Sequence, residues 1–206
     1  AKQVQNAILP DYNVLKSVFK ESFLYTKPKE ILTGDFYFCE KNENNIFVAL
    51  ADCTGHGLSA SLLSVYAFDV LRNTVRQMSL SSTSEILKTV QDTIGDTLNS
   101  EGADHRKIDV MEIALVKINL SDMIMEFSGA KSRVFRVVDG ITEVKKGTNT
   151  GISIGKKINN NPFNLFVTKL KKGEMVYLSS DGYYDQFRQE SQIKFQKSRL
   201  MDLLAK

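Results

Sequence analysis

Three aspartates in short glycine-containing segments are the residues of this sequence best suited to chemistry. Asp35 opens a strand-like run, whereas Asp52 and Asp181 each follow one, and a glycine lies next to or shortly after each of them. A β fold can bring strand ends together although they are far apart in sequence. A cluster of carboxylates with tight backbone around it is what a pair of hard divalent cations needs.

Each aspartate also has a structural interpretation when it is taken alone. Asp52 or Thr54 is suited to be the N-cap of a following helix, and Asp181 with Gly182 is typical of a hairpin turn. The glycines after Asp52 match neither the dinucleotide-binding fingerprint nor the phosphate-binding loop, which needs Gly-Lys-Ser/Thr. The three segments together favour a functional site.

The histidines and cysteines are less informative. His56 lies between two glycines, and it is either a general acid or metal ligand or, as its place favours, a structural residue that fixes the turn. His105, in a polar loop, is expected to be inert. Cys39 is expected to be a strand residue, whereas Cys53 lies at the turn, where oxidative sensitivity is open to test. Two cysteines imply no disulfide framework, and a reducing compartment is the default.

The elements that must position these residues follow from the apolar pattern. A continuous apolar run over 46–51 predicts a buried strand, and a period of 3.6 residues over 58–77 predicts a helix after the glycine turn. A second helix is expected at 85–99, capped by Thr83 or Ser84. The other expected helices are 1–9 and 194–205, and the other expected strands are 21–26, 35–40, 110–118, 123–128, 133–138, 141–145, 163–169 and 174–180, with Asp139-Gly140 as a hairpin turn.

The order of these elements predicts an α+β sandwich, with helices stacked on antiparallel sheets. The 206 residues suit one domain, and 42% hydrophobic residues are enough for a core. A net charge of +3 with dispersed lysines argues against nucleic acid as a partner. No apolar stretch is long enough to span a membrane, and the N-terminus has no signal-peptide pattern. The chain also lacks an initiator Met, so we expect it to be part of a longer protein.

The ordered set of motifs resembles the metal-dependent protein phosphatases of the protein phosphatase 2C superfamily, in the bacterial branch typified by sporulation stage II protein E. The resemblance covers nearly the whole chain, and the set is highly specific. The segments that carry it are 1–10 (AKQVQNAILP), 34–37 (GDFY), 52–57 (DCTGHG), 111–115 (MEIAL), 128–130 (SGA) and 180–187 (SDGYYDQF).

This resemblance implies a β-sandwich of two antiparallel sheets flanked by helices, with two Mn²⁺ or Mg²⁺ ions at one edge. It implies that Asp52 bridges both ions, that Asp35 and Asp181 supply further ligands, and that the backbone carbonyl of Cys53 is another ligand. Hard cations prefer such oxygen donors. The three aspartates are then the catalytic residues, acting through a metal-activated water that attacks phosphorus in line without a phosphoenzyme.

The chain departs from the family pattern at three places. The family's final aspartate, usually in an Asp-Asp pair on a last strand, has no counterpart before Lys206. We therefore expect the sandwich to lack its last strand, and one metal site to be firm and the other weak. Lys131 replaces an asparagine of the pattern, and 188–189 (Arg-Gln) replaces a Gly-Gly pair.

The resemblance implies a serine/threonine protein phosphatase whose substrate is a phosphorylated regulatory protein, in this branch usually an anti-sigma-factor antagonist. The alternative is a degenerate phosphatase domain that binds a partner or relays a signal without turnover. Residues 1–10 are expected to end an upstream linker helix from a sensor or coiled-coil region that takes part in a homodimer. Residues 11–206 are expected to form the C-terminally shortened phosphatase-like domain. We expect a cytoplasmic location, including that of a cytoplasmic domain in a larger membrane-anchored protein.

Overall fold

The computed structural model describes residues 2–9, 13–28, 31–98, 108–154, 162–187 and 193–205. The helices are α1 (Lys2–Ile8), α2 (Asn13–Val18), α3 (Gly57–Gln77), α4 (Thr83–Leu98), α5 (Asp181–Tyr184) and α6 (Lys197–Leu204). The strands are β1 (Asp35–Asn42), β2 (Asn45–Cys53), β3 (Ile108–Asn119), β4 (Ile124–Ala130), β5 (Arg133–Val138), β6 (Ile141–Lys146), β7 (Ile152–Ile154), β8 (Phe166–Lys169) and β9 (Met175–Leu178).

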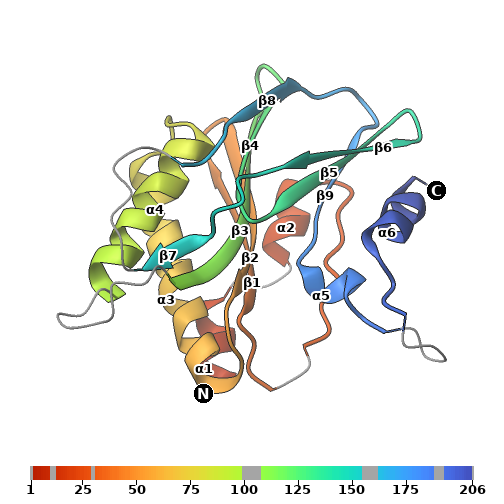
Figure 1. The fold of residues 1–206 in the computed structure, drawn as a ribbon. Coiled ribbons are helices and arrows are strands. Elements are labelled where there is room, and N and C mark those ends of the chain that lie inside the picture. Colours follow the sequence, from red (N-terminus) through yellow and green to blue (C-terminus); the bar gives the residue numbers. More distant parts are fainter. Residues whose placement is uncertain are drawn as a thin grey trace.

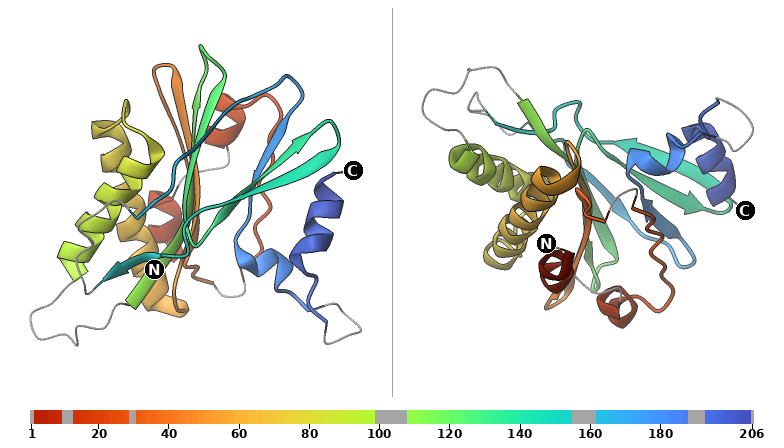
Figure 2. Two further views of the ribbon diagram at one scale, coloured as in Figure 1. Left: turned by 45° about the horizontal axis from the view of Figure 1, so that its top comes forward. Right: turned by 90° about the horizontal axis from the view of Figure 1, so that it is seen from below.

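Two antiparallel sheets face each other (Figure 1). The larger sheet has the order β1-β2-β3-β4-β8, and β7 pairs with β3 beside this path. The smaller sheet has the order β6-β5-β9. Helices α3 and α4 cover the outer face of the larger sheet, and α6 lies against β6 on the other side of the molecule (Figure 2). The expected α+β sandwich of two antiparallel sheets flanked by helices is confirmed.

The alternation of side chains divides the strands of the larger sheet between two cores. One face packs against α3 and α4 through Phe36, Phe38, Ala49, Ala51, Ile113, Leu115, Phe68, Leu71, Ile86, Leu87 and Val90. The opposite face has a second buried cluster, formed by Ala114, Val116, Ile118, Met125, Phe127 and Val134. Each large side chain buried in this way contributes about 1.5–3 kcal/mol. Successive positions along a strand therefore face different layers, which also determines the face on which a polar residue lies.

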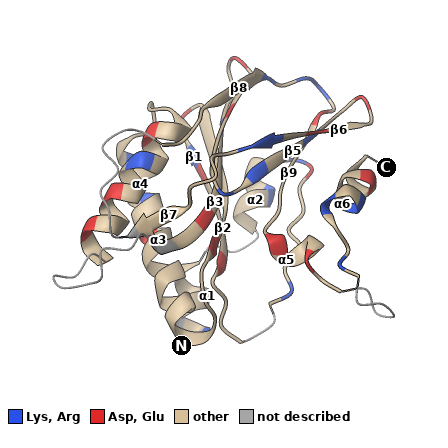
Figure 3. Ribbon diagram, in the orientation of Figure 1, with Lys and Arg blue, Asp and Glu red and all other residues tan. Residues whose placement is uncertain are grey.

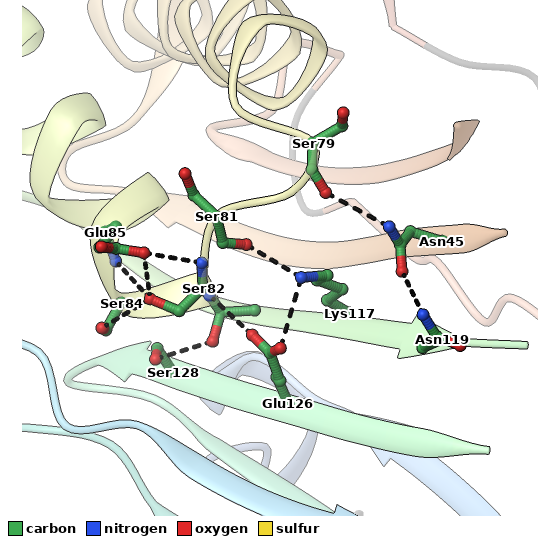
Figure 4. A network of polar contacts seen from close by, with 11 residues as sticks. Asn45, Ser79, Ser81, Ser82, Ser84, Glu85, Lys117, Asn119, Glu126 and Ser128 are labelled. Atoms are coloured by element: carbon green, nitrogen blue, oxygen red, sulfur yellow. Dashed lines mark hydrogen bonds and ion pairs between the residues drawn. The ribbon is translucent and has the colours of Figure 1, made fainter. Parts of the chain in front are cut away.

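A buried polar network joins the connection between α3 and α4 to the larger sheet (Figure 4). The Nζ of Lys117 on β3 donates to the carbonyl oxygen of Ser81 (3.0 Å) and lies 3.3 Å from a carboxylate oxygen of Glu126 on β4. Thr83 and Ser128 share a hydrogen bond of 2.9 Å between their hydroxyl groups. Because Lys117 is almost fully buried, its charge requires these partners. The network holds the end of β4 at a fixed distance from α4.

The segment 21–26 was expected to be a strand, and this prediction is wrong. Its alternating aromatic residues instead pack against the smaller sheet and α5. The Phe23 ring lies 6.1 Å from that of Tyr177 on β9, and the Tyr25 ring lies 5.8 Å from that of Tyr183. The alternation therefore reflects an extended segment held by ring contacts rather than by the backbone hydrogen bonds of a ladder.

Other differences are confined to short elements and element ends. Helices α2 and α5 and strand β7 were not expected, strands β8 and β9 are shorter than expected, and α6 begins at Lys197. Ser82, rather than Thr83 or Ser84, caps α4: its hydroxyl accepts from the Glu85 amide (3.3 Å), and its own amide donates to the Glu85 carboxylate (2.8 Å), which is a capping box. The turn at 139–140 is confirmed, with the positive φ values (51° and 75°) of a type I′ hairpin.

Candidate functional site

Three acidic residues form a row across neighbouring strands of the larger sheet. Asp35 on β1 is the register partner of Asp52 on β2, and Asp52 is the register partner of Glu112 on β3. Side chains opposite each other in antiparallel strands have Cβ atoms about 4.5–5.5 Å apart. The adjacent residues Phe36 and Ala51 belong to the core under α3 and α4. By alternation the acidic row therefore faces the smaller sheet.

Asp181 approaches this row from the smaller sheet. It is the first residue of α5, which follows β9. The hydroxyl of the preceding Ser180 donates to a carboxylate oxygen of Asp35 (3.3 Å), so the two sheets touch at the row. Tyr183 connects α5 to the extended segment 21–26 through the edge-to-face contact of its ring with that of Tyr25.

A surface pocket lies where these elements meet. Its lining residues are Leu50, Ala51, Asp52, Glu112, Lys131, Ser132, Arg133, Ser179, Ser180, Asp181 and Tyr184. Figure 3 shows acidic residues on the larger sheet and at the start of α5, and basic residues on β5. The pocket therefore has acidic walls contributed by the larger sheet and by α5, and a basic segment, Lys131 to Arg133, that leads into β5.

Burial and mutual repulsion oppose the ionisation of the acidic residues. Burial, followed by the charge and hydrogen bond of Asp35 and the charges of Asp181 and Glu112, raises the pKa of Asp52 to about 7. Burial, followed by the charge of Asp185, also raises the pKa of Asp181. A divalent cation would relieve this repulsion, and oxygen donors are the ligands that Mg²⁺ and Mn²⁺ prefer. The donor set therefore fits such a cation chemically.

The arrangement is nevertheless open. Asp35 and Asp52 are neighbours, and Asp181 lines the same pocket as Asp52. Within the described ranges, however, no group of three or more His, Cys, Asp or Glu side chains is gathered closely enough to hold a metal ion. A cation with ligands on both sheets would have to draw Asp181 toward the row.

The turn that follows Asp52 is held by backbone contacts. The amide and the hydroxyl of Thr54 both donate to the carbonyl oxygen of Val110, at 3.0 and 3.3 Å. A Cβ atom on Gly34 would lie only 2.7 Å from the carbonyl oxygen of Cys53, so this approach of two chain segments requires glycine. The Cys53 carbonyl, expected as a metal ligand, therefore lies close to the segment that carries Asp35.

His56 and the two thiols do not line the pocket. His56 is exposed at the N-cap position of α3 and does not line the pocket. The Cys53 side chain lies in the core beneath the helices, where burial raises the pKa of its thiol. Burial also raises the pKa of the Cys39 thiol, to about 11. Neither thiol has the lowered pKa of a reactive cysteine. His105 and residues 188–189 lie outside the described residues.

Glu112 and Arg133 line the pocket but were not predicted from the sequence to belong to the site. Glu112 is the one charged residue in the apolar run 110–116, and an acidic residue in a buried strand was a usable signal. Arg133 opens β5 in an ordinary strand pattern, which carried no such signal. Lys131, noted only as a departure from the family pattern, lines the same pocket.

Two antiparallel sheets with a carboxylate-lined edge define the class as the protein phosphatase 2C fold. The SiaA-PP2C domain of Pseudomonas aeruginosa superposes with a TM-score of 0.84 and 25% identity, over 99% of this chain and 78% of that one. The structure of the PP2C phosphatase domain and a fragment of the regulatory domain of SpoIIE from Bacillus subtilis gives a TM-score of 0.60 at 20% identity, over 74% of this chain and 41% of that one. The S. agalactiae serine/threonine phosphatase gives 0.57 at 17% identity, over 87% and 88%.

Residues 42–206 match the family model of stage II sporulation protein E (SpoIIE), and the chain belongs to this family. The comparison with curated protein sequences gives no match. Among the helices of the described residues, none has the length and apolar character needed to cross a lipid bilayer.

Proposed function

We propose that this chain is a metal-dependent serine/threonine protein phosphatase that hydrolyses a phosphorylated regulatory protein. The observation that carries the proposal is the row of Asp35, Asp52 and Glu112 on the larger sheet, with Asp181 at the start of α5 lining the same pocket as Asp52 and Glu112. Membership of the SpoIIE family and the likeness to phosphatase domains support this class of enzyme.

The proposed ligands are the carboxylates of Asp35, Asp52 and Asp181 and the backbone carbonyl of Cys53. Two Mn²⁺ or Mg²⁺ ions would supply an activated water and neutralise the oxygens of a phosphoryl group. Asp52, central in the row and partly buried, is suited to contact both ions. We expect the site next to the row to be firm and the site that depends on Asp181 to be weak.

The chain itself contributes orientation and a low dielectric. The segment of Asp52 is fixed on one side by the ladder to β1 and on the other by the ladder to β3. The apolar core directly behind the row strengthens every electrostatic interaction in the pocket, because fewer waters screen it. The row is therefore rigid, whereas Asp181 on a four-residue helix can adjust its position.

The test combines metal binding with hydrolysis. We expect Mn²⁺-dependent hydrolysis of p-nitrophenyl phosphate, and calorimetry should detect one tight Mn²⁺ site. Asp52→Asn should abolish both signals. Asp139→Asn removes an equal charge from an exposed hairpin turn, where asparagine tolerates the positive φ, and should change neither. Wild-type protein that binds Mn²⁺ without hydrolysing any phosphomonoester would contradict the enzyme.

A degenerate domain that binds a partner without turnover is the second candidate. The observation in its favour is that the described residues form no closed group of three metal-binding side chains. The same Mn²⁺ titration separates the candidates, because a degenerate domain would not bind Mn²⁺ tightly. Its binding to a partner protein would also survive the Asp52→Asn substitution.

We further propose that the substrate is a phosphorylated anti-sigma-factor antagonist and that residues 1–10 end an upstream linker helix in a cytoplasmic homodimer. Gln5 of α1 supports such a link. Its Nε2 donates to the carbonyl oxygen of Thr33 (2.7 Å) and to the hydroxyl of Ser64 on α3 (3.1 Å). The amide of Asp35 donates in turn to the Thr33 hydroxyl (3.0 Å). Movement of α1 would therefore be transmitted through Thr33 to Asp35 in the acidic row.

A further inference from the structure

The basic segment of the pocket comes from the connection between the two sheets. β4 ends at Ala130, Lys131 follows with a positive φ of 50°, and Arg133 begins β5. The amide of Lys131 donates to the carbonyl oxygen of Thr148 (2.8 Å), which fixes the turn. Upstream, the hydrogen bond between Ser128 and Thr83 anchors the end of β4 to α4. Lys131 and Arg133 therefore lie on a segment that these hydrogen bonds hold in place, beside the acidic residues of the pocket.

The guanidinium group of Arg133 has an unfilled hydrogen-bonding position. Its carbon lies 5.7 Å from the centre of the Tyr184 ring, a cation–π contact between two residues that both line the pocket. Its Nη1 is buried and has no hydrogen-bond partner among the described residues. A buried charged donor without an acceptor is unfavourable, so this site is suited to an acceptor that arrives with a ligand.

We propose that Arg133 binds the phosphoryl group of the substrate, with Nη1 donating to a non-bridging phosphoryl oxygen and Lys131 adding positive charge at the same edge. This inference rests on the proposed phosphatase function. A guanidinium group matches the oxygens of a phosphate geometrically and is always charged. A phosphomonoester dianion would lie in the pocket between the metal ions, which the acidic residues would hold, and the guanidinium group of Arg133.

The opposing interpretation is that Arg133 only balances the acidic residues and packs against Tyr184. In that case its loss would lower stability and alter metal affinity but would have no particular effect on phosphate. Lys146 provides a matched control, since it is the register partner of Arg133 on β6, is exposed, and does not line the pocket. Its removal takes away one positive charge a single strand further from the pocket.

The experiment uses the Mg²⁺-loaded chain with inorganic phosphate as the probe. Phosphate affinity is measured by calorimetry, and in parallel phosphate is tested as a competitive inhibitor of p-nitrophenyl phosphate hydrolysis. Arg133→Met should weaken phosphate binding about ten- to a hundredfold, as expected for a lost charged hydrogen bond. The KM should rise by a similar factor, while the Mg²⁺ affinity and the melting temperature stay close to wild type. The phosphate affinity of Arg133→Lys should lie between that of wild type and that of Arg133→Met, and the affinity of Lys146→Met should match wild type.

Each of three results would overturn the inference. They are wild-type protein that binds no phosphate, phosphate binding weakened equally by Arg133→Met and Lys146→Met, and Arg133→Met protein that binds phosphate as tightly as wild type. If Arg133→Met does not fold, the comparison of Arg133→Lys with wild type decides. Phosphate binding that depends on Arg133 in a protein without hydrolysis would instead overturn the proposed function and leave this inference standing.

Discussion

Replacing Gly147 by alanine should push apart two chain segments that lie in close backbone contact, one at Gly147 and the other at Gly129. Gly147 follows β6 and lies against Gly129 of β4. A Cβ atom on Gly147 would lie 2.2 Å from the carbonyl oxygen of Gly129 and 2.5 Å from its Cα, whereas real Cβ atoms keep at least 3.0 Å from such neighbours. Both contacts are backbone atoms, so no side chain can rotate away.

The size of the effect follows from what the separation breaks. The strands must move apart by about 1 Å, and such overpacking costs about 1–3 kcal/mol. Three backbone hydrogen bonds join the two segments here: the Thr148 amide donates to the Gly129 carbonyl and the Lys131 amide to the Thr148 carbonyl, each at 2.8 Å, and the Gly147 amide donates to the Ser132 carbonyl at 2.9 Å. Weakening them adds about 1 kcal/mol. We expect Gly147→Ala to lower the free energy of unfolding by about 2–4 kcal/mol.

The assay is urea denaturation, in which the midpoint should fall at an unchanged slope. Gly95→Ala is the matched control, because Gly95 lies inside α4 and its Cβ would make ordinary contacts of 3.6 Å. That variant should gain about 0.5–1 kcal/mol from helix propensity. Gly147→Ala with a loss below 1 kcal/mol, or Gly95→Ala with a larger loss than Gly147→Ala, would refute the reasoning from close approach.

Three further predictions concern the acidic row. Gly34→Ala should displace the Cys53 carbonyl and weaken Mn²⁺ binding about 10- to 100-fold in calorimetry, whereas Gly182→Ala, whose Cβ would lie 3.7 Å from its nearest neighbour, should not. The pKa of Asp52 is raised from 3.8 to about 7 in the folded chain, so the metal-free domain should lose stability as the pH rises from 4 to 7. Mn²⁺ affinity should rise over the same pH range and then level off, because Asp52 must lose its proton to bind the ion. A pH-independent Mn²⁺ affinity would contradict the assignment of Asp52 as a ligand. Gln5→Glu replaces a buried donor by an acceptor and should release α1, lowering its hydrogen-exchange protection by about 1–3 kcal/mol, while unchanged protection would show that these hydrogen bonds do not hold the helix.

The sequence was sufficient to predict the long helices and strands and to locate the three aspartates that lie near glycines. The apolar run 46–51 and the periodic segment 58–77 carry strong patterns, and both became the expected strand and helix. The positions of Asp35, Asp52 and Asp181 at element ends followed from the same patterns. Their roles as ligands remain predictions.

Sequence reasoning failed where tertiary contacts decide the outcome. The segment 21–26 has the alternation of a strand, but its aromatic rings pack against Tyr177 and Tyr183 without a ladder. The pocket position of Arg133 depends on the connection between two sheets, and no local pattern encodes that connection. Glu112 joined the row through the register of β2 with β3, which only the pairing of distant strands determines.

The location of the candidate site on two separate sheets has a mechanical consequence. Asp35 and Asp52 belong to the larger sheet, whereas Asp181 opens α5, which follows β9 of the smaller sheet, and the hydrogen bond from Ser180 to Asp35 joins the two sides directly at this edge. A cation held by both sides would act as a removable cross-link in the sandwich. The angle between the sheets would then change with cation occupancy. A partner that binds the outer helices would therefore bind the metal-loaded and the metal-free site with different affinities.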